Sequence, residues 1–363
     1  MKLLVPDHIL KIAPYTPGKP IEEVEREYGI RDSIKLASNE NPLGPSPQAL
    51  TAIQQALASL HRYPDDAGVE LRESLAQKLN VRPENIVLGN GSDDVISMLT
   101  QALLQPMDEA IMLQPAFLWY EISVRSAGAI PIGVPLKSYT MDLASIIDRL
   151  TPKTRMVFIN NPHNPTGAAV TRDALKKFIE LVPGNVAVVI DEAYIEFARD
   201  PSCPESVEFL NSGKTVVGLR TFSKAYGLAG LRIGYGIMQP AVAEILHRIR
   251  QPFNANTLAQ VAARAALGDE AFFQKTIALV HAELDFMYHA LDGLGIEYCP
   301  SQANFFLINV AQDANTVFEK FLKQGIIVRS MTSYSLPKHI RVNVGLHAEN
   351  VRFLEVLEEI TNN

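Results

Sequence analysis

Four polar segments of the sequence each follow a short apolar run and carry residue types that can do chemistry: Gly89–Asp94, Asn160–Gly167, Asp191–Tyr194 and Arg220–Gly227. In open α/β sheets, ligands bind beyond the carboxyl ends of the strands, where such segments gather. Gly89–Asp94 opens a helical stretch, and the first backbone N–H groups of a helix can hold a phosphate. Four polar segments that converge at one sheet edge predict a binding site.

Gly89–Asp94 can also have a purely structural role. Ser92 can cap the following helix, while Asp93 and Asp94 interact favourably with the positive end of its dipole. The segment is not a dinucleotide-binding fingerprint, because Asp94 stands where the third glycine would be. This difference argues against a nicotinamide-dependent dehydrogenase, which the same α/β layers could otherwise support.

The other three segments are ambiguous when each is taken alone. Asn160–Gly167 can be a loop of turn-forming residues, Asp191 can be a helix cap or an ion-pair partner, and Lys224 can be a solvated surface lysine. The combination is more specific. Ser223-Lys224 is followed after seven residues by Arg232, and glycines occur at positions 227, 230 and 234.

At these motifs the chain strongly resembles the fold-type I pyridoxal-phosphate enzymes, the aspartate aminotransferase superfamily. The matching motifs follow the same order along nearly the whole chain: Asn164-Pro-Thr-Gly, Asp191-Glu-Ala-Tyr194, Ser223-Lys224, Arg232 and Arg341 in Ile-Arg-Val-Asn-Val-Gly. The resemblance implies pyridoxal 5'-phosphate as the cofactor, with the protein binding it and tuning its electronic properties. It implies no metal ion.

The resemblance also assigns roles around the cofactor. Lys224 would form the resting Schiff base and later move the proton, and Asp191 would keep the ring nitrogen protonated. Tyr194 and Asn164 would hydrogen-bond the phenolic oxygen of the ring. Ser92 and Asp93 would offer backbone N–H groups to the cofactor phosphate, and Thr221, Ser223 and Arg232 would add hydroxyl and guanidinium contacts. Phe117 would stack on the ring of the cofactor, although it can also be a core residue.

Within the superfamily, the resemblance is closest to the histidinol-phosphate aminotransferases. The arm around Tyr15 looks like that family's substrate-touching arm, and Ser38-Asn-Glu-Asn-Pro42 and Arg62-Tyr63-Pro64-Asp65 resemble its usual motifs. The tyrosine of the last motif reaches the neighbouring subunit's cofactor phosphate in the family. Tyr63 therefore implies a homodimer.

Arginines are expected to bind the substrate. Arg341 would clamp a carboxylate in a bidentate fork that lysine cannot match, although a plain surface arginine is the alternative. Arg329 precedes it by 12 residues and suits a substrate with an anionic tail. Because histidinol phosphate has no carboxylate, the division of roles between Arg329 and Arg341 stays open. Asn164 is also expected to contact the substrate.

The implied reaction is transamination between L-histidinol phosphate and 2-oxoglutarate, which gives imidazole acetol phosphate and L-glutamate in histidine biosynthesis. Relatives of this branch transaminate aromatic amino acids or decarboxylate threonine phosphate, and both remain alternatives. A further alternative is a relative that binds a ligand but is catalytically silent. The presence of both Lys224 and Asp191 argues against this alternative. His163, Ala116 and Leu118-Trp119 depart from the residues most common in the family and concern substrate fit.

Short, β-branched and nearly all apolar runs are typical of strands buried on both faces of a mostly parallel sheet. They are Ile86–Leu88, Ala110–Leu113, Met156–Ile159, Val186–Ile190, Thr215–Leu219 and Gly234–Met238. Two helices are expected before them, one capped by Ser46 with Pro47 at its first position and one at Val69–Leu79. Helices between the strands are expected at Val95–Leu104, Leu143–Leu150 and Arg172–Leu181. Alternating strands and helices predict an α/β layer fold, with the sheet flanked by helices.

Three parts of the chain are expected. Residues 1–45 carry six prolines and predict an extended N-terminal arm rather than packed elements. Residues 46–240 form the large cofactor-binding domain. Residues 241–363 form a smaller α+β domain, with helical stretches at 241–268, 270–291, 314–324 and 349–360 and strand-like pieces at 304–310, 326–328 and 340–344.

Composition excludes several classes of protein. Hydrophobic residues make up 47% of the 363, which excludes a mainly disordered chain, and a net charge of −7 gives no electrostatic footprint for nucleic acid. Cys203 and Cys299 are too far apart for a typical zinc site and too few for a disulfide scaffold. With neither a signal-peptide pattern nor an apolar run of about 18 residues, we expect no membrane association and a cytoplasmic protein.

Overall fold

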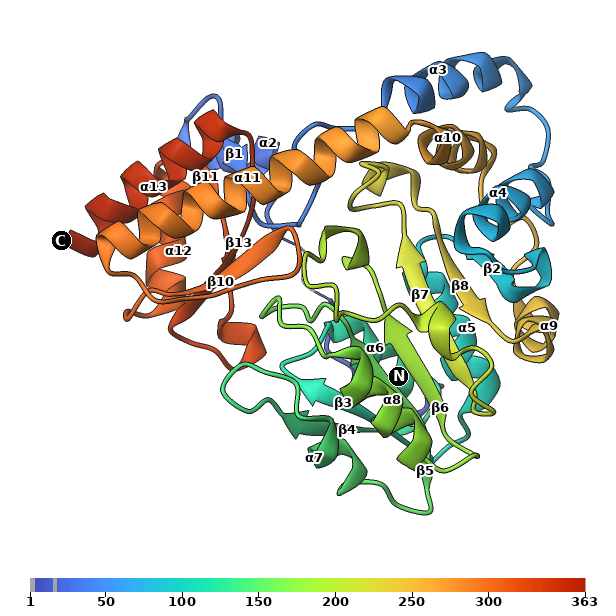
Figure 1. Ribbon diagram of the computed structural model, residues 1–363. Helices are drawn as coiled ribbons and strands as arrows, with labels where there is room; N and C mark the ends of the chain where they lie inside the picture. Colours follow the sequence, from blue (N-terminus) through green and yellow to red (C-terminus); the bar gives the residue numbers. More distant parts are fainter. Residues whose placement is uncertain (1–3, 16–17, 363) are drawn as a thin grey trace.

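The computed structural model describes residues 4–15 and 18–362, and its centre is a seven-stranded sheet (Figure 1). Across the sheet lie β2 (Ile86–Gly89), β8 (Gly234–Met238), β7 (Val216–Thr221), β6 (Ala187–Asp191), β5 (Thr154–Asn160), β3 (Glu109–Gln114) and β4 (Ile130–Pro135). Only β8 is antiparallel to its neighbours. The predicted mostly parallel sheet is confirmed, and its six expected strands are present with bounds shifted by no more than two residues.

The sequence analysis missed β4, the strand at one edge of the sheet. Its sequence carries Pro131, Gly133 and Pro135, which are unusual in a central strand but tolerated at an edge. Most of its residues are only half-buried, so the apolar pattern of a doubly covered strand is absent. Edge position therefore explains both its composition and the failure to recognise it.

Helices cover both faces of this sheet and bury its alternating side chains. Val157 packs toward one face and Phe158 toward the other, in two separate hydrophobic clusters. One face is covered by α5 (Ser92–Leu103), α6 (Leu118–Ser126) and α9 (Pro240–Ile249), and the other by α7 (Leu143–Ile147) and α8 (Arg172–Leu181). The expected helix α8 is confirmed, and so are α3 (Pro47–Ala56), capped by Ser46, and α4 (Val69–Leu79).

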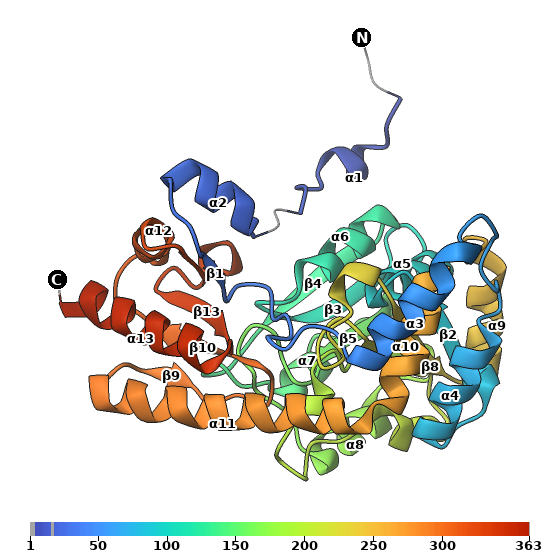
Figure 2. The same ribbon diagram turned by 90° about the horizontal axis from the view of Figure 1, so that it is seen from above.

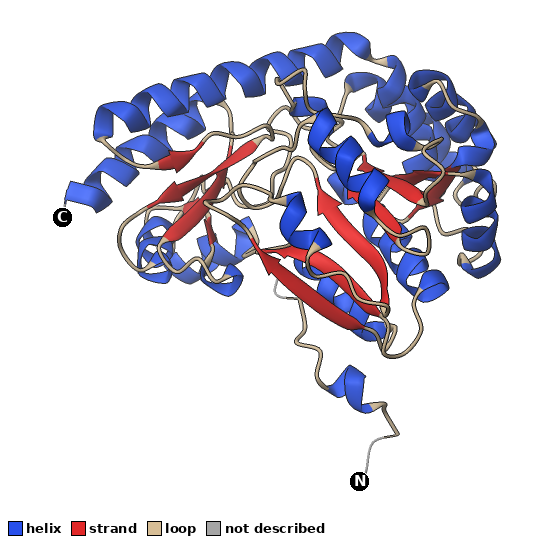
Figure 3. Cartoon of the chain, turned by 60° about the horizontal axis from the view of Figure 1, so that its bottom comes forward, coloured by secondary structure: helices blue, strands red, loops and turns tan. Residues whose placement is uncertain are grey.

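A second, antiparallel sheet forms the smaller part of the molecule (Figure 3). Its strands are β12 (Arg329–Ser330), β13 (His339–Asn343), β10 (Phe305–Asn309) and β9 (Tyr298–Cys299). It packs with α12 (Ala314–Lys323), α13 (His347–Asn362) and the long helix α11 (Glu270–Leu294), which runs alongside both parts (Figure 2). This arrangement confirms the smaller α+β unit expected at the C-terminal end.

The predicted helical stretch at 241–268 is two helices, α9 and α10 (Thr257–Gly268), with Pro252 between them. α10 packs on α3 and α4, and α9 packs on α5, so both helices contact elements of the larger part. The domain boundary predicted at residue 240 stays a prediction. These contacts favour a later boundary, at the junction of α10 and α11.

The prediction that residues 1–45 contain no packed elements is wrong. Two helices, α1 (Asp7–Leu10) and α2 (Ile21–Tyr28), and a strand, β1 (Ile34–Lys35), form in this segment. Val24 of α2 is fully buried in a small cluster, and β1 pairs in parallel with β11 (Ile326–Ile327). Pro20 sits at the cap of α2, where its missing N–H costs nothing, so this proline precedes the helix instead of excluding it.

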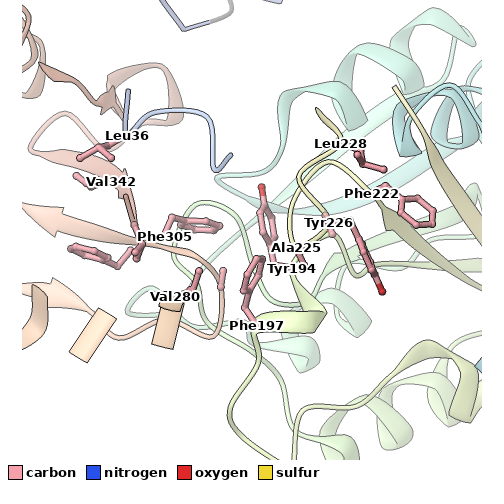
Figure 4. Close-up of a cluster of buried hydrophobic side chains, with 14 of the residues drawn as sticks. Leu36, Tyr194, Phe197, Phe222, Ala225, Tyr226, Leu228, Val280, Phe305 and Val342 are labelled. Carbon is pink, nitrogen blue, oxygen red and sulfur yellow. The ribbon is translucent and has the colours of Figure 1, made fainter. Parts of the chain in front are cut away.

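The largest hydrophobic cluster joins the two parts of the molecule. Figure 4 shows Tyr194, from the larger part, and Phe305, from β10 of the smaller part, whose ring centroids lie 4.9 Å apart in an edge-to-face arrangement. Core side chains therefore fix the smaller sheet beside the carboxyl edge of the larger one. Among the described residues, no helix combines the length and apolar character that crossing a bilayer requires.

Candidate active site

The carboxyl ends of β5, β6 and β7 and the start of α5 meet at a cavity of about 260 Å³. The structure brings together there most of the residues that the sequence analysis selected: Tyr15, Ser92, Asp93, Phe117, Asn164, Asp191, Tyr194, Thr221, Ser223, Lys224 and Arg232. This convergence follows from the parallel sheet, because strands that run in one direction end at one edge.

Asp191 ends β6 and is only 4% exposed. Its Oδ2 accepts a hydrogen bond from the Tyr120 hydroxyl at 2.5 Å, and its Oδ1 accepts one from the backbone N–H of Ala193 at 3.0 Å. Burial raises the pKa of the Asp191 carboxyl to about 6, and the two hydrogen bonds oppose this rise. The side chain is therefore a buried acid held in one orientation, able to carry a negative charge near neutral pH.

Lys224 lies across the same cavity and is partly buried, which does not fit a solvated surface lysine. Its Nζ donates a hydrogen bond to the carbonyl oxygen of Ser38 at 3.0 Å and lies 5.8 Å from the centre of the Tyr194 ring. Burial, followed by the positive charge of Arg341, lowers the pKa of the amine to about 8. A substantial fraction of the amine is therefore neutral and nucleophilic at slightly alkaline pH.

The start of α5 offers backbone donors to an anion. Gly91 precedes the helix with φ of 81° and occupies the cap position, so the interpretation of Ser92 as the helix cap is wrong. A Cβ on Gly234 would collide with the backbone nitrogen of Ser92, so the glycine lets β8 pass close to this helix terminus. Arg232 adds positive charge beside it, with its Nη2 3.3 Å from Asp93 Oδ2.

Hydroxyl groups line the same end of the cavity. The Thr221 hydroxyl donates to Ser223 Oγ at 3.0 Å and accepts from the Ser223 backbone N–H at 3.1 Å. Thr221 is the last residue of β7, and Ser223 follows it directly before Lys224. Together with the α5 terminus and Arg232, these groups form a donor-rich corner suited to a phosphate.

Tyr194 and Asn164 lie together, as predicted, at another wall of the cavity. The Tyr194 hydroxyl accepts hydrogen bonds from Asn39 Nδ2 at 2.9 Å and from Asn164 Nδ2 at 3.4 Å. Burial raises the pKa of the tyrosine to about 12, so the hydroxyl keeps its proton and can donate it to an acceptor in the cavity.

Arg341 does not line the cavity directly but stands behind Asn164. Its Nη1 donates to Asn164 Oδ1 at 2.6 Å and its Nη2 to the Ala37 carbonyl oxygen at 2.7 Å. Its Nε is buried and has no hydrogen-bond partner among the described residues. The alternative of a plain surface arginine is excluded, because this guanidinium is buried. Arg329 is paired in register with Arg341 across β12 and β13.

Phe117 and Tyr63, the two predicted aromatic contacts, differ in position. Phe117 lines the cavity and is half-buried, with its ring edge-to-face to that of Tyr120 at 5.6 Å. Tyr63 is 81% exposed and stacks on Phe253 at 4.5 Å, away from the cavity of its own chain. A role for Tyr63 in this cavity therefore requires a second chain.

The residues at which the sequence departs from the family lie next to the site. His163 is buried with its Nδ1 3.0 Å from Thr166 Oγ1, and burial lowers its pKa to about 4, so the ring is neutral. Ala116 and Leu118 line a neighbouring cavity of about 650 Å³, which shares Phe117 with the site. These positions are consistent with an influence on substrate fit.

Sequence reasoning missed several residues at the site. Ser38, Glu40 and Asn160 line the cavity, Asn39 contacts Tyr194, and Tyr120 contacts Asp191. The dense polar run Ser38-Asn-Glu-Asn41 was a usable signal for Ser38, Asn39 and Glu40. Tyr120 gave none, because its position in an apolar helical stretch is typical of a core residue.

A partly buried lysine and a buried carboxylate therefore face one cavity, beside a helix terminus whose backbone N–H groups could bind an anion. Residues 31–357 match the family of class I and class II aminotransferases, which is most of the chain. The chain belongs to this family, and the predicted superfamily is confirmed.

The chain is 46% identical over 357 residues to the histidinol-phosphate aminotransferase of Methylobacillus flagellatus, covering 98% of this chain and 96% of the relative. It is 45% identical over 353 residues to that of Moorella thermoacetica, covering 97% and 92%. The crystal structure of the Sinorhizobium meliloti histidinol-phosphate aminotransferase in complex with pyridoxal-5'-phosphate is similar with a TM-score of 0.91 and 25% identity, covering 100% of this chain and 98% of that one. A Thermus thermophilus aspartate aminotransferase double mutant has a TM-score of 0.86 at 25% identity, with complete coverage of both chains.

Proposed function

We propose that this chain is a pyridoxal 5'-phosphate-dependent aminotransferase that transfers an amino group between L-histidinol phosphate and 2-oxoglutarate. The observation that carries the proposal is the placement of Lys224 and Asp191 around one cavity with the α5 terminus. The names of its relatives, which match nearly the full length of the chain, support the choice of substrate. This reaction would belong to histidine biosynthesis.

The residues of the cavity fit the cofactor. The donor-rich corner formed by the α5 terminus, Thr221, Ser223 and Arg232 suits its phosphate, and the buried carboxylate of Asp191 suits its cationic ring nitrogen. Phe117 offers an aromatic face at the cavity wall. When bound, pyridoxal 5'-phosphate supplies an electron-accepting ring that stabilises negative charge on the substrate carbon.

The protein's own groups hold and move protons around that ring. The neutral amine of Lys224 would attach the cofactor and, once released, would accept a proton from the substrate carbon and pass it on. Asp191 would hold the proton of the ring nitrogen by its negative charge. Tyr194 and Asn164 would donate hydrogen bonds to the phenolic oxygen, and Asn39 and Arg341 hold these two side chains in place.

The substrates would be held from the other side. The unpartnered Nε of Arg341 offers a donor to an anionic group, and Asn164 lies within its reach. Arg329 stands beside Arg341 in the same small sheet, and Tyr15 closes the cavity from the N-terminal segment. Two arginines suit a site that must accept a phosphate in one half-reaction and carboxylates in the other.

We further propose a homodimer in which Tyr63 contacts the cofactor of the neighbouring subunit. Tyr63 is exposed and stacked on Phe253, and exposed apolar side chains lie nearby on α3 and the turn after it: Leu50, Leu57 and Leu60. An apolar surface of this kind is typical of an interface between subunits.

Cys203 and Cys299 are both free thiols, which supports the predicted cytoplasmic location.

A panel of amino donors tests the substrate. Purified cofactor-loaded protein is mixed with a small excess of L-histidinol phosphate, phenylalanine, tyrosine or glutamate, and the visible absorbance of the bound cofactor is followed over one turnover. We expect L-histidinol phosphate and glutamate to discharge it and the aromatic amino acids to leave it. Discharge by the aromatic amino acids but not by L-histidinol phosphate would contradict the proposed substrate and favour an aromatic aminotransferase.

A further inference from the structure

Within the described part of the chain, Tyr120 makes the only hydrogen bond from a side chain to the carboxylate of Asp191. The Asn160 side chain donates instead to the Asp191 backbone oxygen. Its hydroxyl donates to Asp191 Oδ2 at 2.5 Å, and the residue is 1% exposed. This hydroxyl makes no other hydrogen bond within the described residues, so the contact acts on Asp191.

Packing fixes the direction of this hydroxyl. The Tyr120 ring stacks on Phe158 of β5 at 4.6 Å and meets Phe117 edge-to-face at 5.6 Å. The neighbouring Trp119 donates from its indole nitrogen to the Asp93 carbonyl oxygen at 3.0 Å, which ties the start of α6 to α5. These contacts hold the ring in the orientation that directs its hydroxyl at Asp191.

We propose that Tyr120 is a positioning residue for the cofactor: its hydroxyl orients Asp191 and keeps that carboxylate ionised toward the ring nitrogen. The inference rests on the proposed function, because it concerns the contact between Asp191 and pyridoxal 5'-phosphate. Tyr120 itself does not line the cavity and touches neither cofactor nor substrate.

The charges around Asp191 make such a donor necessary. Burial, Asp93 of α5 and the adjacent Glu192 all disfavour a second negative charge and raise the pKa of Asp191. Only the Tyr120 hydroxyl and the Ala193 N–H lower it, and Tyr194 stays protonated and neutral nearby. The Tyr120 hydroxyl also keeps its proton, because burial and the carboxylate raise its own pKa, so it acts as a donor throughout.

The test is binding of pyridoxamine 5'-phosphate to the cofactor-free protein, since this ligand forms no covalent bond with Lys224. Tyr120→Phe keeps the ring packing and removes the hydroxyl. We expect the dissociation constant to rise about tenfold, the size typical of a lost hydrogen bond to a charged group. Asp191 then ionises less readily. As the pH is lowered, the affinity of the variant should therefore begin to fall about one pH unit earlier, at a higher pH, than that of the wild-type protein.

Two controls separate this role from general damage. Tyr288→Phe removes the hydroxyl of a half-buried tyrosine, which accepts from the Ser301 N–H at 3.0 Å in the smaller part, and it should leave both the affinity and the pH profile unchanged. A cofactor analogue with C–H in place of the ring nitrogen should bind Tyr120→Phe and wild-type protein equally, because Asp191 then has no partner to orient.

Equal loss of affinity for both ligands would overturn the proposal, since it would show a packing defect, and an unchanged pH profile would do the same. If Tyr120→Phe does not fold, Tyr120→His provides an aromatic donor at the same position. The proposal is then supported if the ratio of its dissociation constants for the two ligands equals that of the wild-type protein. Failure of the wild-type protein to bind pyridoxamine 5'-phosphate at all would instead contradict the proposed function.

Discussion

The two walls of the cavity are built in different ways. On one wall, Asp191, Thr221 and the α5 terminus each come directly from an element of the seven-stranded layer. On the other wall, Arg341 contacts Asn164, 177 residues earlier in the chain, and Ala37, 304 residues earlier. The first wall is set by a single sheet, whereas the second exists only while the smaller sheet and the N-terminal segment stay packed against it.

The charges of the two walls differ as well. Behind the sheet wall, the buried Arg220 guanidinium pairs with Glu192 at 2.8 Å, and Glu192 also accepts from the Ser206 hydroxyl at 2.9 Å. On the opposite wall, Arg341 keeps a buried donor with no partner among the described residues. The ion pair behind the sheet wall is complete, whereas the spare donor of Arg341 suits an anionic substrate that comes and goes.

Removing the lysine of the sheet wall should have the largest effect. We expect Lys224→Ala to lower turnover by about 10³-fold or more, because the amine that attaches the cofactor and moves the proton is lost. Its thermal unfolding midpoint should stay close to that of the wild type. Lys214→Ala is the matched control, since Lys214 also donates to a backbone carbonyl but lies away from the cavity. Retained turnover in Lys224→Ala would refute the assignment.

A substitution in the opposite wall should separate substrate binding from cofactor binding. Arg341→Lys keeps the charge but loses the planar fork, so kcat/KM should fall about 100-fold while the affinity for the cofactor is preserved. Steady-state kinetics and a cofactor titration measure the two effects. The exposed Arg248, changed to lysine, should show neither. A parallel loss of cofactor affinity in Arg341→Lys would mean that the walls are not independent.

The protonation of Lys224 should govern uptake of the cofactor. Because burial lowers its pKa to about 8, the protonated amine predominates below that pH and only the neutral form reacts. The rate at which the cofactor-free protein takes up pyridoxal 5'-phosphate should therefore rise about tenfold per pH unit below pH 8 and level off above it. Stopped-flow absorbance at several pH values measures this. A rate that still rises at pH 10 would place the lysine outside the buried wall.

The smallest effect is expected from a residue that belongs to neither wall of its own chain. Tyr63→Phe should raise the dissociation constant of the cofactor about threefold to tenfold in the dimer, through loss of one hydroxyl contact to the phosphate. Equilibrium dialysis measures the affinity, and sedimentation confirms that the dimer persists. Tyr28→Phe, which removes a surface hydroxyl bonded to Glu319, is the control. Equal affinities for wild type and Tyr63→Phe would count against a contact between subunits.

Much of the sheet wall could be predicted from the sequence. Asp191 and Lys224 come shortly after short apolar runs, and parallel strands must deliver such residues to one edge. The same rule could not find Tyr120, which lies in a helix and looks like a core residue until its hydroxyl is seen against Asp191. Nor could it find α2, because the prolines that precede this helix resemble the prolines of an extended arm.

The sequence by itself determined the fold class, the order of the strands along the chain and the chemistry available at their ends, since these depend on local patterns of apolar and polar residues. Only the tertiary structure decided which partners those residues meet. Arg341 gains Asn164 and Ala37, and Tyr194 gains Asn39, from segments far away in the chain. Burial, and with it the lowered pKa of Lys224 and the raised pKa of Asp191, also comes from packing of distant elements around them, and no local pattern contains that information.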